Sequence, residues 1–348
     1  MPQLRVLVAD DSLSFRSVLV DSLQKLPVAR IVALAGNGQE AIEKFDQFNP
    51  DVVTLDVEMP LLDGLQVLEK LQSRLATTAV IMVSAVTRRS AEATIRALQL
   101  GAFGFITKPE EGTPDKNRDV LRQQLSSVFD AIAAKRAPVG FETAARVSAT
   151  IERKPSARPK IIGIGASTGG PHALGEVLPR LPASLPVPVV LVQHMPPLFT
   201  ASLAEAMAGK CAVKVVEADH GMTLQAGTVY IAPGGRHMRV VDDQQSASKR
   251  IELTSDAPEH FCRPAVDYLF RSLATGYGGS AVGVILTGMG QDGAAGLLAM
   301  RQAGASTIGQ DAASCTVYGM PREAYRLGAV EQQLPLASIA ERIAKLAG

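Results

Sequence analysis

A single serine lies in a glycine-rich turn at the end of an apolar run. The run that begins at Ile161 ends in Gly165, and Pro171 stands where a helix would begin. Between them, Ser167 and Gly169 complete the pattern G-x-S-x-G, which is typical of a nucleophile elbow. Glycine suits such a turn, because lifting a serine hydroxyl off the end of a strand requires unusual backbone angles. The free N–H groups at the helix start would point toward the serine and could stabilise an oxyanion.

Two other interpretations of this turn stay open from the stretch alone. Gly163 and Gly165 also begin a dinucleotide-binding fingerprint, but Thr168 occupies the position of its third glycine. That fingerprint also needs an acidic residue after the next strand to hold a ribose hydroxyl, whereas the next apolar run ends in Gln193 and His194. The remaining interpretation is a structural glycine turn in which the serine is incidental.

Two further side chains complete a possible catalytic triad with Ser167. His194 follows the apolar run Val187–Gln193, and Asp292 lies in a second glycine-rich turn after the run Ser280–Thr287. A neutral imidazole can take the serine proton during attack, and a buried carboxylate can orient that imidazole. The order Ser, His, Asp differs from the Ser, Asp, His order of α/β-hydrolases, so we exclude that fold but keep the chemistry.

Weaker alternatives exist among the other polar residues of this half of the chain. His260 and Cys262 could supply a thiol nucleophile, but no oxyanion turn lies beside them in the sequence. Asp292 taken by itself could be a helix cap. We interpret His220 and His237 as surface or loop residues.

A second group of reactive side chains lies near the start of the chain. Asp10 and Asp11 follow the first apolar strand, and the third, fourth and fifth strands lead to Asp56, Ser84 and Lys108. The carboxyl ends of parallel strands meet at one edge of a sheet, so these side chains should converge. Three converging carboxylates repel one another unless cations lie among them, and Mg²⁺ together with the lysine meets that need. We predict a phosphoryl site with Asp56 as the acceptor, although each residue alone has an ordinary explanation as a cap or surface group.

Two α/β units are needed to position these residues. In residues 1–136, five apolar strands alternate with helical patterns, which predicts a parallel sheet covered on both faces. Residues 160–348 alternate in the same way and predict a doubly wound, mainly parallel α/β catalytic domain. The segment 137–159 is rich in Pro, Ser, Ala and Arg and is interpreted as an exposed linker. Thr228–Ala232 and Met238–Val241 flank a Pro-Gly-Gly turn and predict a hairpin.

Composition narrows the class of protein. The 348 residues are 47% hydrophobic without low-complexity tracts, as expected for a globular chain. The formal net charge of +1 gives no reason to expect nucleic acid or an anionic membrane as a partner. The three separated cysteines form neither a disulfide framework nor a zinc pattern. No run reaches the roughly 20 apolar residues of a spanning helix. We therefore predict a cytoplasmic protein that does not insert into membranes.

The first unit resembles a two-component response-regulator receiver domain. The matching motifs are Asp10-Asp11, Asp56-Val-Glu-Met-Pro60, Asp63-Gly64, Ser84-Ala85 and Lys108-Pro109. The resemblance implies a flavodoxin-like (βα)5 fold with strand order 2-1-3-4-5, and phosphorylation of Asp56 by a histidine kinase. It implies that Asp10, Asp11 and Asp56 hold Mg²⁺. It also implies that Ser84, Phe105 and Lys108 form the switch that relays phosphorylation.

The second unit resembles the catalytic domain of the chemotaxis protein-glutamate methylesterases. The matching motifs are Gly165-Ala-Ser-Thr-Gly-Gly170, Gln193-His194-Met195, Ala232-Pro-Gly-Gly235, Arg263-Pro264-Ala265-Val266-Asp267 and Thr287-Gly-Met-Gly-Gln-Asp-Gly293. The resemblance implies that Ser167 is the nucleophile, His194 the base and Asp292 the acid that orients it. It implies an oxyanion and substrate pocket formed by Thr168, Gly169 and Met289.

The two resemblances together cover nearly the whole chain and imply a function. They imply hydrolysis of glutamate γ-methyl esters, and deamidation of glutamines, on methyl-accepting chemotaxis receptors, with a CheA-type histidine kinase as phosphodonor. The ester chemistry would need no cofactor. We expect phosphorylation of Asp56 to activate the enzyme by removing the receiver from the Ser167 cleft. A nucleotide-binding module and a DNA-binding output domain are the alternative classes, although the chain lacks the basic helical tail of the latter.

Overall fold

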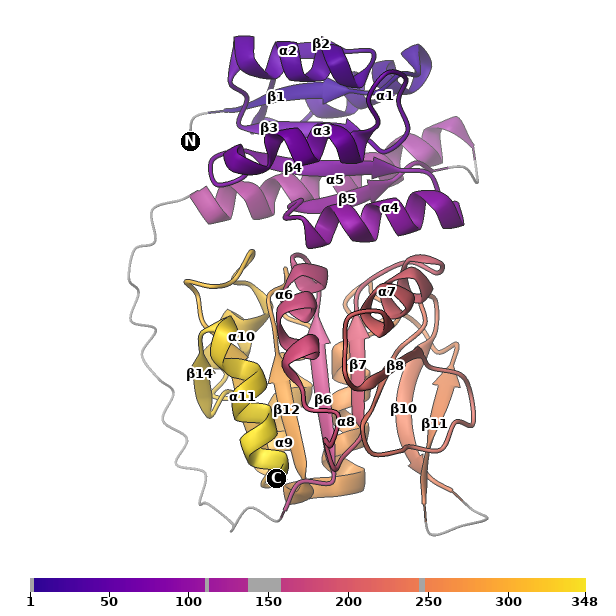
Figure 1. The fold of residues 1–348 in the computed structure, drawn as a ribbon, viewed down its shortest axis with the longest axis vertical. Coiled ribbons are helices and arrows are strands. Elements are labelled where there is room, and N and C mark those ends of the chain that lie inside the picture. The colour runs from indigo at the N-terminus through magenta and orange to yellow at the C-terminus, as the bar shows by residue number, and fades with distance from the viewer. Residues whose placement is uncertain (1–2, 110–112, 137–157, 244–247) are drawn as a thin grey trace. The chain divides into compact units, whose positions relative to one another are not determined.

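The computed structural model describes residues 3–109, 113–136, 158–243 and 248–348. The chain divides into two compact units, Met1–Pro138 and Val139–Gly348 (Figure 1). The predicted linker 137–159 falls almost wholly outside the described residues. None of the described helices combines the length and the apolar character that crossing a membrane requires.

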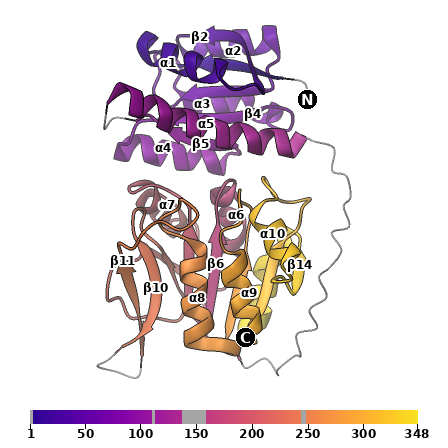
Figure 2. The same ribbon diagram turned by 180° about the vertical axis from the view of Figure 1, so that it is seen from behind.

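The first unit is a five-stranded parallel sheet in the order β2-β1-β3-β4-β5, which confirms the predicted receiver topology. Its strands are β1 (Leu4–Ala9), β2 (Ala29–Ala35), β3 (Val52–Asp56), β4 (Ala79–Ser84) and β5 (Gly104–Thr107). Helices cover both faces: α1 and α5 pack together on one face, and α2, α3 and α4 lie on the other (Figures 1 and 2). The helices are α1 (Leu13–Gln24), α2 (Gly38–Phe48), α3 (Gly64–Leu71), α4 (Arg88–Gln99) and α5 (Pro114–Arg136), with a 3₁₀ turn at Gln72–Arg74.

Side-chain caps begin the first four helices of this unit just after the strand ends. The capping side chains accept hydrogen bonds from backbone N–H groups three residues later, and they belong to Ser12, Asn37, Asp63 and Thr87. After Asp63, the chain passes so close to β3 that a Cβ on Gly64 would lie 2.1 Å from the carbonyl oxygen of Asp56. Glycine at position 64 therefore lets the start of α3 sit directly beside the predicted phosphorylation residue.

The second unit is a seven-stranded, wholly parallel sheet in the order β14-β13-β12-β6-β7-β9-β8. Its strands are β6 (Ile161–Ala166), β7 (Val189–Gln193), β8 (Lys214–Glu217), β9 (Thr228–Ile231), β12 (Ala281–Ile285), β13 (Ser306–Gln310) and β14 (Gln332–Leu334). A separate antiparallel ribbon consists of β10 (His237–Asp242) and β11 (Lys249–Thr254). The strand order reverses direction at β6, which is where open α/β sheets place their sites.

Helices lie on both faces of this sheet, so the predicted doubly wound fold is confirmed. Helices α8 and α9 pack together on one face, and α6 and α11 pack together on the other (Figures 1 and 2). The helices are α6 (Gly170–Val177), α7 (Phe199–Ala208), α8 (Val266–Tyr277), α9 (Ala294–Gln302), α10 (Met320–Arg326) and α11 (Leu336–Ala347), with 3₁₀ turns at Leu178–Arg180 and Gly278–Ser280.

The predicted hairpin between Thr228–Ala232 and Met238–Val241 is wrong. The first segment forms β9, a parallel strand of the large sheet, and the second forms β10, which pairs with β11 in the ribbon. The glycines between them turn the chain away from the sheet: a Cβ on Gly234 would lie 2.3 Å from the carbonyl carbon of Pro196, and Gly235 has φ +78°. The Pro-Gly-Gly segment therefore redirects the chain and does not close a turn between paired strands.

Two glycines in β6 allow helix α8 to pack directly on the sheet. A Cβ on Gly163 would lie 2.4 Å from Leu273 Cδ1, and a Cβ on Gly165 would lie 2.3 Å from Val266 Cγ1. Both contacted side chains are fully buried. The glycines before Ser167 thus bring the start of α8 against the strand that leads to the serine.

Gly163→Ala should destabilise the second unit by about 1–3 kcal/mol, because the added methyl forces close-packed side chains of α8 to move. Gly175→Ala is the matched control: its Cβ would meet no atom within 4 Å, so this change within α6 should be neutral or stabilise by about 0.4–1 kcal/mol. Urea unfolding followed by far-UV circular dichroism measures both changes. Equal midpoints for the two variants would contradict the packing argument.

Candidate active site

Ser167 directly follows β6, the middle strand of the large sheet, and its backbone is held from both sides. Its N–H donates to the carbonyl of Thr287, after β12, at 3.0 Å. Its carbonyl accepts from Nε2 of Gln193, at the end of β7, at 2.9 Å. Since β12 and β7 are the two neighbours of β6, the serine turn is fixed to the strands on either side.

Two glycines shape the start of helix α6 after the serine. Gly169 has φ +78°, and a Cβ there would lie 2.4 Å from Thr316. A Cβ on Gly170 would lie 1.8 Å from Oε1 of Gln193, a side chain that is only 1% exposed. No larger residue fits at either position, so these glycines bring the helix N-terminus close to the serine.

Three backbone N–H groups at this edge of the sheet have no acceptor in the described part of the chain. They belong to Thr168, Gly169 and Met289. Thr168 is tied down through its carbonyl, which accepts from the hydroxyl of Thr287 at 2.9 Å. Groups of fixed, unbonded N–H donors are what an oxyanion requires. The predicted pocket residues therefore offer suitable donors.

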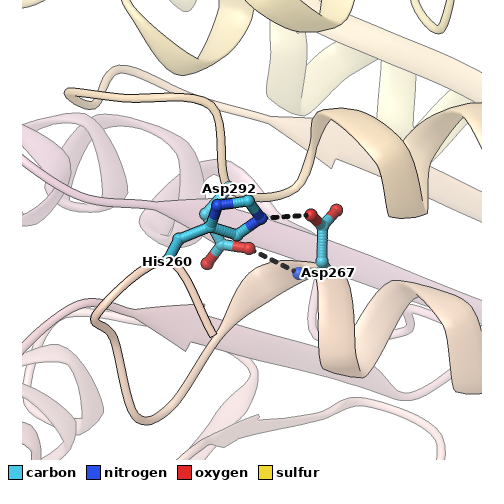
Figure 3. A group of neighbouring side chains, drawn as sticks. All are labelled: His260, Asp267 and Asp292. Atoms are coloured by element: carbon cyan, nitrogen blue, oxygen red, sulfur yellow. Dashed lines mark hydrogen bonds and ion pairs between the residues drawn. The ribbon is translucent and has the colours of Figure 1, made fainter. Parts of the chain in front are cut away.

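His194 and Asp292 form a direct hydrogen bond. The imidazole Nε2 lies 2.7 Å from Oδ2 of Asp292, and the carboxylate is buried, with a side-chain exposure of 2%. Asp292 also accepts from the N–H group of Val266 at 2.7 Å. It accepts as well from the N–H group of Asp267 at 2.9 Å (Figure 3), and both groups lie at the start of helix α8. The carboxylate is therefore an acceptor for three donors, and the imidazole is held by the nitrogen that faces it.

Electrostatics favour the charged forms of this pair. Burial disfavours a charged imidazole and is the largest single effect, but the contacts with Asp292 and Cys262 together outweigh it and hold the pKa of His194 above its ordinary value. Burial likewise disfavours the carboxylate, but the hydrogen bond from His194 and those from the backbone hold the pKa of Asp292 below its ordinary value. The pair would stabilise an imidazolium formed during catalysis. To act as the base, the imidazole must start neutral, with its proton on the Nε2 that faces Asp292, and Nδ1 would then take the serine proton.

A thiol is the hydrogen-bond partner of Nδ1. Nδ1 of His194 lies 3.5 Å from Sγ of Cys262, whereas the Ser167 hydroxyl makes no hydrogen bond within the described residues. The serine and the histidine are nonetheless neighbours, because the His194 N–H donates to Ala166 at 3.1 Å and Gln193 Nε2 contacts both their carbonyls, at 2.9 and 3.2 Å. In resting hydrolases the catalytic hydrogen bond often tightens only when substrate binds.

A second histidine and carboxylate lie beside the first pair. His260 Nε2 is 3.0 Å from Oδ2 of Asp267, and the donor atoms of His260, Asp267 and Asp292 lie within 4.8 Å of one another (Figure 3). Oδ1 of Asp267 accepts from the N–H of Gly296 at 2.6 Å. Each carboxylate oxygen of this group accepts a hydrogen bond from the protein itself. The cluster therefore joins helix α8 to the loop that carries Asp292.

The receiver carboxylates converge as predicted. Oxygen atoms of Asp10, Asp11 and Asp56 lie within 4.8 Å of one another. Lys108 Nζ lies 2.7 Å from Oδ2 of Asp56 and 3.0 Å from Oδ2 of Asp10. Burial raises the pKa of Asp56 to about 7, an effect that Lys108 opposes and Asp10 reinforces.

These carboxylates fit a divalent cation. Oδ2 of Asp10 is buried and, despite its closeness to Lys108, has no hydrogen-bond donor among the described residues. Buried carboxylates are costly unless cations compensate them, and Asp10 and Asp56 share the single ammonium of Lys108, at 3.0 and 2.7 Å. Mg²⁺ prefers carboxylate oxygens as ligands, and Asp10, Asp11 and Asp56 each offer one at this place. The residue types and their convergence therefore suit this ion.

The predicted switch residues lie at the ends of β4 and β5. Ser84 is fully buried, and its hydroxyl lies 3.1 Å from the carbonyl of Ala85 and accepts from Thr94 Oγ1 at 3.0 Å. Within the described residues it makes no hydrogen bond with Asp56. Phe105 is half-buried in β5. The serine is thus turned toward helix α4, through Thr94.

Comparison with known proteins identifies the family. The CheB methylesterase family model matches residues 162–343, which is more than half of the chain, and the response regulator receiver domain model matches residues 6–116. The chain belongs to the CheB methylesterase family and carries a receiver domain. A protein-glutamate methylesterase/protein-glutamine glutaminase of Agrobacterium fabrum is 48% identical over 98% of this chain and 96% of its own length.

Other members of the CheB methylesterase family agree. The protein of the same name from Desulfotalea psychrophila is 40% identical over 99% of this chain and 98% of its own length. The crystal structure of the Thermotoga maritima CheB methylesterase catalytic domain matches with a TM-score of 0.53 and 37% identity, covering 55% of this chain and 100% of that domain. The likeness thus extends over both the sequence and the fold of the second unit.

Asp292→Asn should lower the pKa of His194, because the amide keeps the shape of the side chain but removes the charge that stabilises the imidazolium. NMR titration of the imidazole resonances measures the change. Glu176→Gln is the control, since it removes an exposed carboxylate that pairs with Arg180 on α6. It should leave the His194 titration unchanged. A His194 pKa that does not fall in Asp292→Asn would refute the electrostatic role of the carboxylate.

Proposed function

We propose that this chain hydrolyses γ-methyl esters of glutamates on methyl-accepting chemotaxis receptors and deamidates glutamines there, in the cytoplasm. Membership of the CheB methylesterase family supports the reaction class. The observation that carries the site assignment is the buried His194–Asp292 hydrogen bond beside the clamped Ser167 turn. The cysteines of the chain are unpaired thiols, which suits a reducing compartment.

The first half of the proposed reaction forms an acyl-enzyme. The Ser167 hydroxyl attacks the ester carbonyl while Nδ1 of His194 takes its proton, and Asp292 stabilises the resulting imidazolium. The N–H groups of Thr168, Gly169 and Met289 receive the developing oxyanion. The tetrahedral intermediate then expels methoxide, which leaves as methanol after His194 returns the proton. From a glutamine the same step releases ammonia.

The second half regenerates the serine. A water molecule attacks the acyl carbonyl, His194 again takes the proton, and the Ser167 oxygen leaves and recovers it. The products are a glutamate carboxylate and the free enzyme. All groups in both halves come from the ends of β6, β7 and β12, so the chemistry needs no cofactor of its own.

Ser167→Ala should reduce methanol release from methylated receptor membranes by at least about 10³-fold, because no hydroxyl remains to form the acyl-enzyme. Cys262→Ala tests the neighbouring thiol as the nucleophile and should keep turnover within about tenfold of the wild type. Gas chromatography of the released methanol measures both rates. The opposite pattern, with activity lost in Cys262→Ala and kept in Ser167→Ala, would assign the reaction to the thiol.

We further propose that a CheA-type histidine kinase phosphorylates Asp56 and so activates the enzyme. Asp10, Asp11 and Asp56 would hold Mg²⁺, which offsets charge on the phosphoryl group when bound. Lys108 contacts the acceptor carboxylate and would pair with the phosphoryl oxygens. Ser84 and Phe105 would relay the change, and the hydrogen bond of Ser84 with Thr94 connects that relay to α4.

Acetyl phosphate with Mg²⁺ should raise the methanol-release rate of the wild type by roughly 5–150-fold, the range of typical allosteric coupling. Asp56→Asn should abolish this rise, because the amide cannot accept the phosphoryl group. Asp46→Asn, an exposed carboxylate paired with Arg74, is the control and should respond as the wild type does. The fragment 160–348 should be more active than the unphosphorylated chain. Activity no higher than that of the unphosphorylated chain would refute inhibition by the receiver.

A further inference from the structure

Exposed apolar side chains gather on the loops of the proposed active site. In the described part of residues 160–348, the large hydrophobic side chains exposed to solvent are Leu198, Phe261, Met289 and Leu327. The first follows His194 by four residues, the second is next to Cys262, and the third precedes Asp292 by three. Single exposed hydrophobic residues are ordinary, but a group around a catalytic site marks a binding surface. We call Leu198, Phe261 and Met289 the apolar rim.

Phe261 is the most exposed member of this rim, at 95%. It lies at the tip of a tight turn in which Glu259 and Cys262 exchange backbone hydrogen bonds of 3.1 and 2.8 Å. The two central residues, His260 and Phe261, have φ of 50° and 62°. Such turns favour asparagine and glycine, and a bulky side chain at positive φ is disfavoured. The fold therefore keeps an aromatic ring at a position where local preference would exclude it.

Side-chain contacts on both sides hold the turn 259–262, and with it the Phe261 ring, close to His194. Glu259 pairs with Arg271 at 2.5 Å, and His260 bonds Asp267 at 3.0 Å, which joins the turn to helix α8 (Figure 3). On the other side, Cys262 lies 3.5 Å from Nδ1 of His194. Glu259, His260 and Cys262 thus each contact the protein, whereas the ring of Phe261 is almost wholly exposed. A ring held in this way next to the catalytic base is suited to contact a bound substrate.

We propose that Phe261 docks the substrate polypeptide by packing against apolar side chains that flank the esterified glutamate. The inference rests on the proposed function, in which the ester is part of a protein and not a free small molecule. Ser167 and the N–H donors suffice for the ester group alone, so the ester does not need an aromatic ring on the residue next to Cys262. A protein surface around the ester does need an apolar partner on the rim, and aromatic residues are the usual anchors of such contacts.

Phe261→Gly tests this proposal without straining the turn, since glycine adopts a φ of 62° readily and removes only the ring. The KM for methylated receptor membranes should rise about tenfold, as expected for the loss of one anchor. Hydrolysis of a capped glutamate γ-methyl ester should stay within about twofold of the wild type. The unfolding midpoint should not fall. The separate variant Phe261→Leu keeps an apolar side chain, so its KM for receptor membranes should stay close to that of the wild type.

Leu327→Gly is the matched control, because Leu327 is 42% exposed but lies at the far end of α10 from the loop that carries Met289. It should change neither substrate's KM. A receptor KM that is unchanged in Phe261→Gly would overturn the docking role, and so would an equal loss on both substrates. A rise in capped-ester hydrolysis by the unphosphorylated variant would assign the ring to the receiver instead. Inactivity of the wild type on both esters would overturn the proposed function and this inference with it.

Discussion

The carboxylate of Asp292 is a buried charge on which the second unit depends. Three donors satisfy it together: the imidazole of His194 and the N–H groups of Val266 and Asp267. The two N–H groups belong to the first turn of α8, where the helix dipole also favours a negative charge. A buried carboxylate with fewer donors would be expensive to ionise, so the loop after β12, the start of α8 and the loop after β7 must come together. The glycines of β6 make this possible, because they let α8 approach the sheet.

The receiver uses the same edge of a parallel sheet but satisfies its carboxylates differently. Backbone amides and an imidazole surround Asp292, whereas Asp56 has Lys108 at 2.7 Å and the neighbouring Asp10 keeps an oxygen without a donor. The first arrangement is complete within the protein and stabilises a charge that must persist. The second leaves room for added positive charge, which suits the role of phosphoryl acceptor proposed for Asp56. The carboxyl edge of a parallel sheet thus holds Asp292, whose charge the protein itself satisfies, and Asp56, whose surroundings leave space for a cation.

The candidate site residues were easier to place at strand ends from the sequence than some of the strands themselves. Ser167, His194 and Asp56 could be placed because each ends an apolar run that stops abruptly, and such a run in an α/β chain is a buried parallel strand. Edge strands gave no such signal: β14 has only three residues and β8 only four. The hairpin prediction failed because a Pro-Gly-Gly segment marks a change of direction without specifying which strand follows as a partner.

Contacts between distant loops could not be read from local patterns. His237 was interpreted as a surface or loop residue, yet it is fully buried, where it bonds the carbonyl of Ala257 and the N–H of Ala265. Cys262 comes within reach of His194 across 68 positions of sequence, through a turn whose backbone angles its residue types do not favour. The periodicity of hydrophobic residues indicates which face of a helix or strand is buried. Contacts between distant loops depend instead on how the loops pack in three dimensions.

The backbone of Ser167 is bonded to Thr287 on one side and to Gln193 on the other. Moving the proposed nucleophile away from this position would break hydrogen bonds to residues at or just after the ends of two strands of the sheet. Inhibiting this enzyme by deforming the loop that carries Ser167 would therefore cost more free energy than blocking access to that loop. A hydrolase of this design can keep its active site in the working conformation and be regulated only through substrate access. The residues for catalysis and those for regulation can then evolve independently.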